Sequence, residues 1–253
     1  MLSSRYYDGY WSSKPFEVRA MSFTSSRRHF LLTASAAIAG ASLPVFAADH
    51  PAPVGPPAGH VLDLLLEGNK RFAAGAITHP RRSPADFKPL ATGQNPIAAI
   101  VSCSDSRVSP EILFDVGIGD IFAIRIAGNY VNGAGAAVKG SVEYAVAELG
   151  VNLIMVLGHS QCGAVKAAIK HIHDNDALPG AINDLVNSIK PAVIESEKLP
   201  GDKLENAIRA NVRRGVETLS QLEPIIGPRV KTGQLKVVGA TYDLATGKVV
   251  IQS

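Results

Sequence analysis

Four short apolar segments alternate with helix-like stretches between residues 97 and 241, and this alternation limits the possible folds of the 253-residue chain more than any other feature. Short, mainly apolar runs are typical of strands that are buried on both faces of a sheet. They cover residues 97–102, 121–126, 152–157 and 235–241. Apolar residues at helical spacing lie between them, over residues 136–149, 179–198 and 202–222. The sequence therefore predicts an α/β fold with a mainly parallel central sheet of about four strands, flanked by helices on both faces.

The segments before and after this central pattern differ from it. After the fourth apolar run, a turn at Gly247 leads into a short C-terminal strand, residues 249–252, which we expect to pair antiparallel. Before the first run, helical spacing of apolar residues predicts an amphipathic helix that ends near Gly75. Residues 79–94 are rich in proline and predict an irregular arm. The α/β domain therefore has an N-terminal helical arm.

The first 47 residues have the features of an export signal. Residues 26–32 read Ser-Arg-Arg-His-Phe-Leu-Leu, which resembles a twin-arginine motif, and a modestly apolar run follows up to residue 41. Small residues predict cleavage before Ala48, and Met21 is an alternative start. The apolar run is too short, and too rich in alanine, serine and glycine, to predict a transmembrane helix. We expect export to the periplasm by the twin-arginine route, without stable membrane insertion.

These features divide the chain into an export signal (residues 1–47), a proline-rich linker (48–59) and a single globular domain (60–253). Charge is distributed unevenly among them. The export signal contains five of the 25 lysine and arginine residues and two of the 22 acidic residues. The rest of the chain therefore carries 20 residues of each sign. A neutral body lacks the basic patch that nucleic-acid binding needs, so we expect no nucleic-acid partner.

The chain contains only two cysteines, and each lies where an expected strand ends. Residues 103–107 read Cys-Ser-Asp-Ser-Arg after the first strand, and residues 159–163 read His-Ser-Gln-Cys-Gly after the third. Ligands bind at the carboxyl ends of parallel strands, so Cys103, His159 and Cys162 can meet if these strands are neighbours. Two cysteines and a histidine suit Zn²⁺, and three protein ligands leave a fourth position for water, as in a catalytic site. A disulfide between the cysteines is the alternative in an oxidising periplasm.

Asp105 and Arg107 lie two residues apart on the loop after the first cysteine, so both can face the same side. Asp105 could be a fourth metal ligand, which would close the site. Alternatively, it could pair with Arg107 and accept the proton of zinc-bound hydroxide. Two thiolates already cancel the charge of Zn²⁺, so an unpaired carboxylate nearby would further oppose formation of hydroxide. We favour the pair, because Arg107 offsets the charge of the carboxylate and orients it.

The two strings, with 56 residues from the first cysteine to the histidine, resemble the paired motifs of the β-class carbonic anhydrases, and the similarity extends over residues 60–252. The resemblance implies that one zinc ion per chain is held by these cysteines and this histidine, with Asp105 paired to Arg107 in the active state. It also implies that the domain is catalytic.

The resemblance further implies a substrate pocket and an oligomer. Gln94 matches the family's substrate-pocket glutamine, and Gly163 matches the backbone position beside bicarbonate. Phe122 and Tyr144 match aromatic positions that the partner subunit contributes. The family is built from dimers that often pair into larger assemblies. A homodimer or a dimer of dimers with shared active sites is therefore implied.

One departure from the family pattern helps to place this chain. The branch with a non-catalytic bicarbonate site has tryptophan three residues before the first zinc cysteine. This chain has Ile100 at that position, although its Arg125 and Tyr242 stand near other positions of that bicarbonate site. The resemblance thus implies the branch in which the zinc site stays open. The implied function is reversible hydration of carbon dioxide to bicarbonate and a proton by zinc-bound hydroxide. Alternatives are hydrolysis of carbonyl sulfide or carbon disulfide on the same scaffold, and a non-catalytic zinc-stabilised interaction domain.

Overall fold

The computed structural model describes residues 55–252 except residue 177. The expected export signal and residues 48–54 of the expected linker lie outside the described residues. The last two residues of that linker are helical, because α1 (Ala58–Ala73) begins directly after Pro57. A proline just before a helix is tolerated, since the first helical N–H groups have no intrahelical partner. In the described part of the chain, no helix combines the length and the apolar character that crossing a membrane requires.

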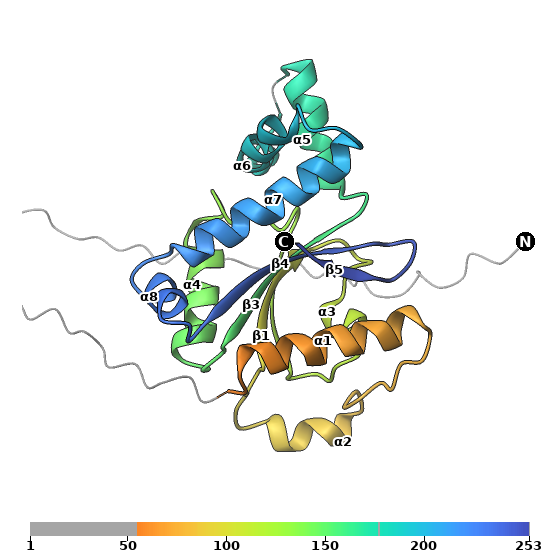
Figure 1. The fold of residues 1–253 in the computed structure, drawn as a ribbon, viewed down its shortest axis with the longest axis vertical. Helices are drawn as coiled ribbons and strands as arrows, with labels where there is room; N and C mark the ends of the chain where they lie inside the picture. Colours follow the sequence, from red (N-terminus) through yellow and green to blue (C-terminus); the bar gives the residue numbers. More distant parts are fainter. Residues whose placement is uncertain (1–54, 177, 253) are drawn as a thin grey trace, which may run out of the picture. The chain divides into compact units, whose positions relative to one another are not determined.

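Five strands form one sheet in the order β2-β1-β3-β4-β5 (Figure 1). They are β1 (Ala98–Cys103), β2 (Ile121–Ile126), β3 (Leu153–His159), β4 (Lys236–Tyr242) and β5 (Val249–Ile251). The first four strands are parallel, and β5 pairs antiparallel with β4. All residues of β1 and β3 are buried, as the mainly apolar runs predict. The expected fold class is confirmed.

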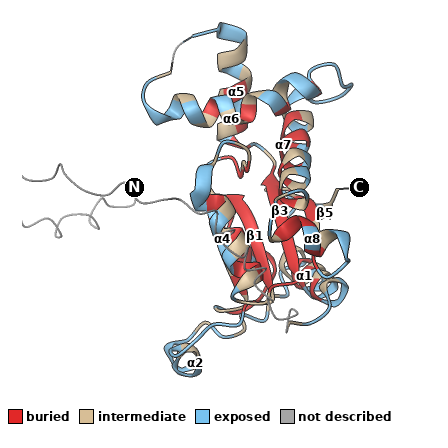
Figure 2. Ribbon diagram, turned by 90° about the vertical axis from the view of Figure 1, so that its left-hand side faces the viewer, coloured by how far each residue is buried: buried red, intermediate tan, exposed pale blue. Residues whose placement is uncertain are grey.

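Helices pack on both faces of the sheet (Figures 1 and 2). The remaining helices are α2 (Pro84–Phe87), η1 (Lys88–Leu90), α3 (Pro110–Leu113), α4 (Gly135–Ala147), α5 (Gly163–Asp174), α6 (Ala181–Ser196), α7 (Lys203–Ser220) and α8 (Ile226–Lys231). Alternate side chains of a strand point to opposite faces of the sheet. On one face, Ile100 and Met155 pack with α1 and α3. On the other face, Val101 and Val156 pack with α4 and α7. The sheet is therefore the central layer between two hydrophobic cores.

The arm over residues 79–94 is only partly irregular, because it contains α2 and η1. Ser83 and Asp86 form a capping box at the start of α2, and Pro84 occupies its first turn. These residues are a recognisable helix-start signal, which the number of prolines in the arm conceals. The expectation of an arm without regular structure was therefore wrong.

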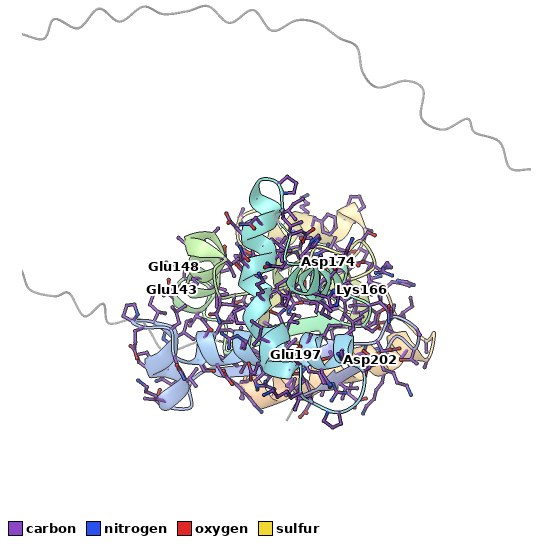
Figure 3. The ribbon with its side chains drawn as sticks, turned by 90° about the horizontal axis from the view of Figure 1, so that it is seen from above. Glu143, Glu148, Lys166, Asp174, Glu197 and Asp202 are labelled. Carbon is purple, nitrogen blue, oxygen red and sulfur yellow. The ribbon has the colours of Figure 1, made fainter. Side chains whose placement is uncertain are left out.

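A third group of buried residues joins α5, α6 and α7 to the edge of the sheet where β1 and β3 end. Cys103 and Cys162 belong to this group, together with Val165 of α5, Ile189 of α6 and Ile208 of α7. The outer side of these helices is charged. Lys166, Asp174, Glu197 and Asp202 are exposed there (Figure 3). The apolar side of the three helices thus encloses the two sulfur atoms.

Candidate functional site

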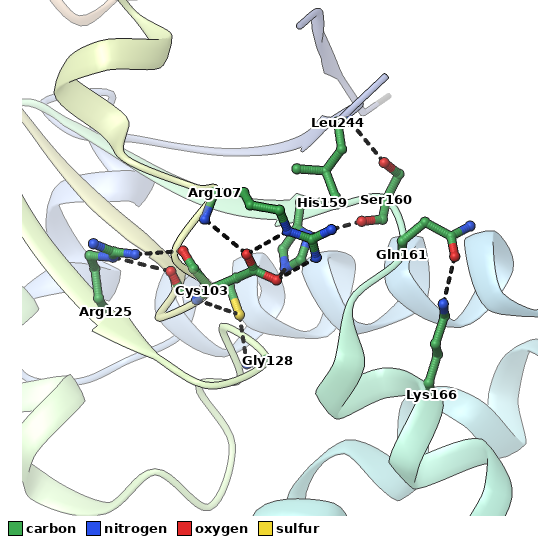
Figure 4. A network of polar contacts seen from close by, with 10 residues as sticks. Cys103, Arg107, Arg125, Gly128, His159, Ser160, Gln161, Lys166 and Leu244 are labelled. Atoms are coloured by element: carbon green, nitrogen blue, oxygen red, sulfur yellow. Dashed lines mark hydrogen bonds and ion pairs between the residues drawn. The ribbon is translucent and has the colours of Figure 1, made fainter. Parts of the chain in front are cut away.

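The three ligands predicted from the sequence come together at the carboxyl edge of the sheet. Cys103 ends β1, His159 ends β3, and Cys162 directly precedes α5. β1 and β3 are neighbours, which brings the first two side chains to the same edge (Figure 4). The three ligand atoms lie within 4.8 Å of one another, and the residues are only 0–5% exposed. Both thiols are free. The group has the composition and compactness of a zinc site.

The imidazole of His159 is held with one nitrogen free. Nδ1 lies 2.9 Å from the carbonyl oxygen of Ser160, which can only accept, so Nδ1 carries the proton and donates it. Nε2 is buried and has no hydrogen-bond partner among the described residues. Buried polar atoms are normally paired, so an unpaired nitrogen beside two thiols fits a residue that binds a metal.

Ser160 is itself anchored to the end of β4 and the chain that follows. Its N–H donates to the carbonyl oxygen of Tyr242 at 2.8 Å, and its Oγ accepts from the N–H of Leu244 at 2.9 Å (Figure 4). Gln161 follows in a left-handed conformation with φ of 58°, and its side chain accepts from Lys166. The turn at Gln161 reverses the chain, so that His159 and Cys162 face the same point.

Backbone N–H groups point at the sulfur of Cys103. The N–H of Gly128 donates to it at 3.2 Å and that of Asp105 at 3.4 Å. The thiol of Cys162 and these N–H groups hold the pKa of Cys103 below its usual range, although burial opposes them. The pKa of Cys162 is raised, because its thiol donates to the Cys103 sulfur and is buried. A cation bound by both sulfurs would displace the remaining thiol proton.

Asp105 forms a two-pronged ion pair with Arg107 beside the ligands. Nε of Arg107 donates to Oδ1 at 2.9 Å and Nη2 donates to Oδ2 at 2.7 Å, while the backbone N–H of Arg107 also donates to Oδ1 at 3.0 Å. These bonds hold the pKa of the Asp105 carboxyl well below its usual range. Oδ2 lies 3.9 Å from Nε2 of His159. The carboxylate therefore stays ionised and lies next to the three ligands.

Of the four residues assigned to the substrate pocket by resemblance, Gly163 is the one beside the ligands, because it is the first residue of α5. Phe122 and Tyr144 lie together elsewhere, with ring centroids 6.0 Å apart. Phe122 pairs with a residue of β1 four positions before Cys103, which is about 13 Å along the sheet. Gln94 is exposed and precedes the start of β1. The structure does not bring these last three residues to the ligands of their own chain.

Two residues that support the site through their main chain or through close packing were not predicted. Gly128 follows β2 with φ of 83°, and a Cβ there would lie 2.6 Å from Cδ1 of Ile189. Gly158 precedes His159, and a Cβ there would lie 2.6 Å from Cγ2 of Val212 on α7. Glycine is therefore required at both positions. The sequence does not single out these two positions, because the chain has 23 glycines and nothing else marks these two.

Comparisons with known proteins agree with this geometry. A sequence model described as carbonic anhydrase matches residues 98–249. Carbonic anhydrase 2 of Mycobacterium tuberculosis is 41% identical over 188 residues, which are 74% of this chain and 89% of that protein. The structure of the β-carbonic anhydrase CcaA is 32% identical, with a TM-score of 0.60 over 77% of this chain and 89% of that one. A tetrameric β-carbonic anhydrase from Sordaria macrospora is 25% identical, with a TM-score of 0.60 over 77% and 98% of the two chains.

Proposed function

Since this chain belongs to the β-class carbonic anhydrase family, we propose that it catalyses the reversible hydration of carbon dioxide to bicarbonate and a proton. The observation that carries the proposal is the buried group of Cys103, His159 and Cys162 beside an ionised carboxylate. Two thiolates and Nε2 of the imidazole would hold one zinc ion per chain. When bound, zinc supplies a water molecule with a lowered pKa as the nucleophile.

In this proposal, Asp105 accepts a hydrogen bond from the nucleophile and orients it, but the proton is not transferred to the carboxylate. Because hydrogen bonds from Arg107 hold the pKa of the carboxyl well below its usual range, Asp105 stays ionised at neutral pH. Its Oδ2 remains available as a hydrogen-bond acceptor on the side of His159. A fixed acceptor sets the direction in which the lone pair of the nucleophile points, which lowers the entropic part of the barrier. We also propose that the site stays open at neutral pH, with Asp105 bound to Arg107 and not to zinc.

We propose that a second subunit completes the substrate pocket. Phe122 and Tyr144 form an aromatic pair, and Tyr144 is 47% exposed in the single chain. Phe122 and Gln94 lie toward the start of β1, whereas Cys103 ends this strand, so a partner chain would bring its copies of these residues to the ligands. The active unit would be a homodimer, and dimers could pair as in the tetrameric relative.

Mixing two inactive variants tests this sharing. The first carries Asp105→Asn, and the second carries Gln94→Ala together with Phe122→Ala. A mixed dimer has one site in which both the ligand side and the pocket side are unaltered. We expect co-expressed, doubly tagged dimers to hydrate carbon dioxide well above the mean of the two parents. No recovery in such dimers would show that each chain supplies its own pocket.

The activity itself is tested by purifying the protein and measuring zinc, free thiols and carbon dioxide hydration together. We expect close to one zinc per chain and a rate that rises with pH, because the nucleophile forms by deprotonation in a charge-neutral site. Carbonyl sulfide and carbon disulfide are assayed alongside as rival substrates. Faster turnover of either compound would identify it, and not carbon dioxide, as the substrate. A disulfide between the two cysteines in protein without zinc would contradict the proposal.

We further propose that the protein is exported to the periplasm. The support is the twin-arginine-like string over residues 26–32 and the small residues before Ala48. A protein that acquires its metal and folds before export would arrive with its thiols already bound. N-terminal sequencing of the protein from a periplasmic fraction would test this, because it reads the cleavage site directly.

A further inference from the structure

Arg125 of β2 binds the loop that carries Asp105. Its Nε donates to the carbonyl oxygen of Cys103 at 3.1 Å, and its Nη2 donates to the carbonyl oxygen of Asp105 at 2.7 Å (Figure 4). The guanidinium thus spans the main chain on both sides of Ser104. Within the described residues, no carboxylate lies within 4.0 Å of Arg125, so these carbonyl groups are its polar partners.

The loop has bonds of its own, but few of them attach it to the sheet. The carbonyl oxygen of Asp105 also accepts from the N–H of Val108 at 3.0 Å, which closes a tight turn. Ser104 donates from its N–H to the carbonyl oxygen of Ile126, the last residue of β2. Among the hydrogen bonds of the described residues, only that from Arg125 joins the main chain of Asp105 to β2. Without Arg125, the turn could move as a unit about Ser104.

A small movement of this turn has a chemical consequence. Oδ2 of Asp105 is 3.9 Å from Nε2 of His159, so the carboxylate is already close to the place of a metal held by the three ligands. In its present position it binds Arg107 through both oxygens. Displaced toward the imidazole, it would take the fourth metal position that a catalytic site keeps for water. The position of the Asp105 main chain therefore determines whether the carboxylate pairs with Arg107 or occupies the fourth metal position.

We propose that Arg125 is a positioning residue that holds Asp105 in its pair with Arg107 and thereby keeps the fourth metal position open. The inference rests on the zinc site of the proposed function. Hydrogen bonds from a charged donor are stronger than those between neutral groups, and two bonds from one rigid guanidinium fix direction as well as distance. Because Arg125 is exposed, its replacement should leave the cores of the fold intact.

Three variants separate this role from a general effect on charge or stability. Arg125→Ala removes both bonds, and Arg125→Lys keeps the charge but replaces the two-pronged donor by a single amine. Arg82→Ala is the matched control, because Arg82 also donates to a main-chain carbonyl, that of Glu111, at 3.1 Å, away from the ligands. Each variant is prepared metal-free, cobalt-substituted and zinc-loaded.

In the metal-free protein, we expect faster amide exchange over residues 104–108 in Arg125→Ala than in wild type or Arg82→Ala. In the cobalt-substituted protein, we expect the visible spectrum of Arg125→Ala at neutral pH to be insensitive to azide, because Asp105 occupies the position that azide would take. In the zinc-loaded protein, we expect carbon dioxide hydration at neutral pH to fall roughly tenfold and to recover at alkaline pH, where hydroxide competes with the carboxylate. Arg125→Lys should lie between wild type and Arg125→Ala in all three measurements.

If the azide response and the pH profile of Arg125→Ala match those of Arg82→Ala, the proposal is overturned, whatever the overall rate. If Arg125→Lys matches wild type in its azide response and its pH profile, a positive charge is sufficient and the two-pronged hydrogen bond is not needed. That result would also overturn the proposal. A wild-type protein that responds to azide but does not hydrate carbon dioxide would refute the proposed function alone. In that case the cobalt spectra of the variants would still decide the role of Arg125.

Discussion

Asp105→Asn is expected to lower kcat/KM for carbon dioxide hydration by roughly two to three orders of magnitude while the zinc content stays at its wild-type level. The carboxylate receives three donors from Arg107, two on Oδ1 and one on Oδ2. An asparagine has one acceptor oxygen, and its amide N–H groups would meet an arginine donor. The side chain would therefore turn away from Arg107, and the nucleophile would lose its fixed acceptor.

Asp202→Asn is a matched control for this experiment. Asp202 also accepts a backbone N–H, that of Glu205 at 2.8 Å, but it caps the start of α7 on the surface. Asparagine is an equally good N-cap, so this variant should keep both activity and stability. Loss of zinc in Asp105→Asn would identify Asp105 as a metal ligand. Unchanged hydration in Asp105→Asn would show that catalysis does not depend on this carboxylate. No hydration in either wild type or the variant, with zinc retained, would point to a zinc domain without catalysis.

Asp115→Ala is expected to lower the free energy of unfolding by about 3 kcal/mol. The Asp115 carboxylate is fully buried and accepts from Nε of Arg71 at 2.7 Å, from the N–H and Oγ1 of Thr78, and from the N–H of His79. It thus ties α1 and the arm to the end of α3. Alanine would leave these donors unpaired and would also be strained at φ of 44°.

Chemical denaturation of wild type, Asp115→Ala and Asp115→Asn measures this effect. Both variants lose the charge of the carboxylate. Asparagine keeps one oxygen acceptor and tolerates the left-handed conformation better than alanine. The difference in stability between the two variants therefore measures backbone strain and the lost acceptor, apart from the charge. We expect Asp115→Asn to be less destabilised than Asp115→Ala. A loss below about 1 kcal/mol in Asp115→Ala would show that the arm is held by other contacts.

The same carboxylate should make stability depend on pH. Burial alone would raise the pKa of Asp115, but hydrogen bonds from Arg71, Thr78 and His79 outweigh it and hold the pKa below its usual range. A carboxyl with a depressed folded-state pKa stabilises the fold fully above its unfolded pKa of about 3.9 and loses this contribution as pH falls further. The stability difference between wild type and Asp115→Ala should therefore be constant at neutral pH and narrow below about pH 4.

Most of the sheet could be predicted from the sequence, because β1 and β3 are buried along their whole length and β2 and β4 are buried in part. Short, mainly apolar runs located β1, β2, β3 and β4 to within two residues, and the turn at Gly247 located β5. The short helices α2, α3 and α8 were not predicted. α8 contains Gly227 and Pro228, which predict a turn, and its burial against the sheet overrides that local preference. Helices of one or two turns are too short to show a helical period. α2 buries no residue, and the capping box of Ser83 and Asp86 is its local signal.

The candidate ligands could be predicted because few residues of a metal-binding type lie where an expected parallel strand ends. The residues that position them could not. Gly128 and Ser160 contribute main-chain atoms, which any residue has, and Arg125 reaches the loop from a strand that is distant in the sequence. Only the register between β1 and β2, in which Ser102 pairs with Arg125, brings that guanidinium within reach of the loop. Register depends on the whole sheet and leaves no local signal.

The edge strand β2 is only six residues long, yet in the proposed dimer it serves two reaction centres at once. Arg125 reaches the loop of its own chain, and Phe122, three residues earlier, points to the opposite face, where it would meet carbon dioxide bound by the partner. A shift of β2 along its axis would therefore alter the metal environment of one subunit and the substrate pocket of the other together. In the proposed dimer, such a strand would couple the two subunits mechanically, without any ligand that passes between them.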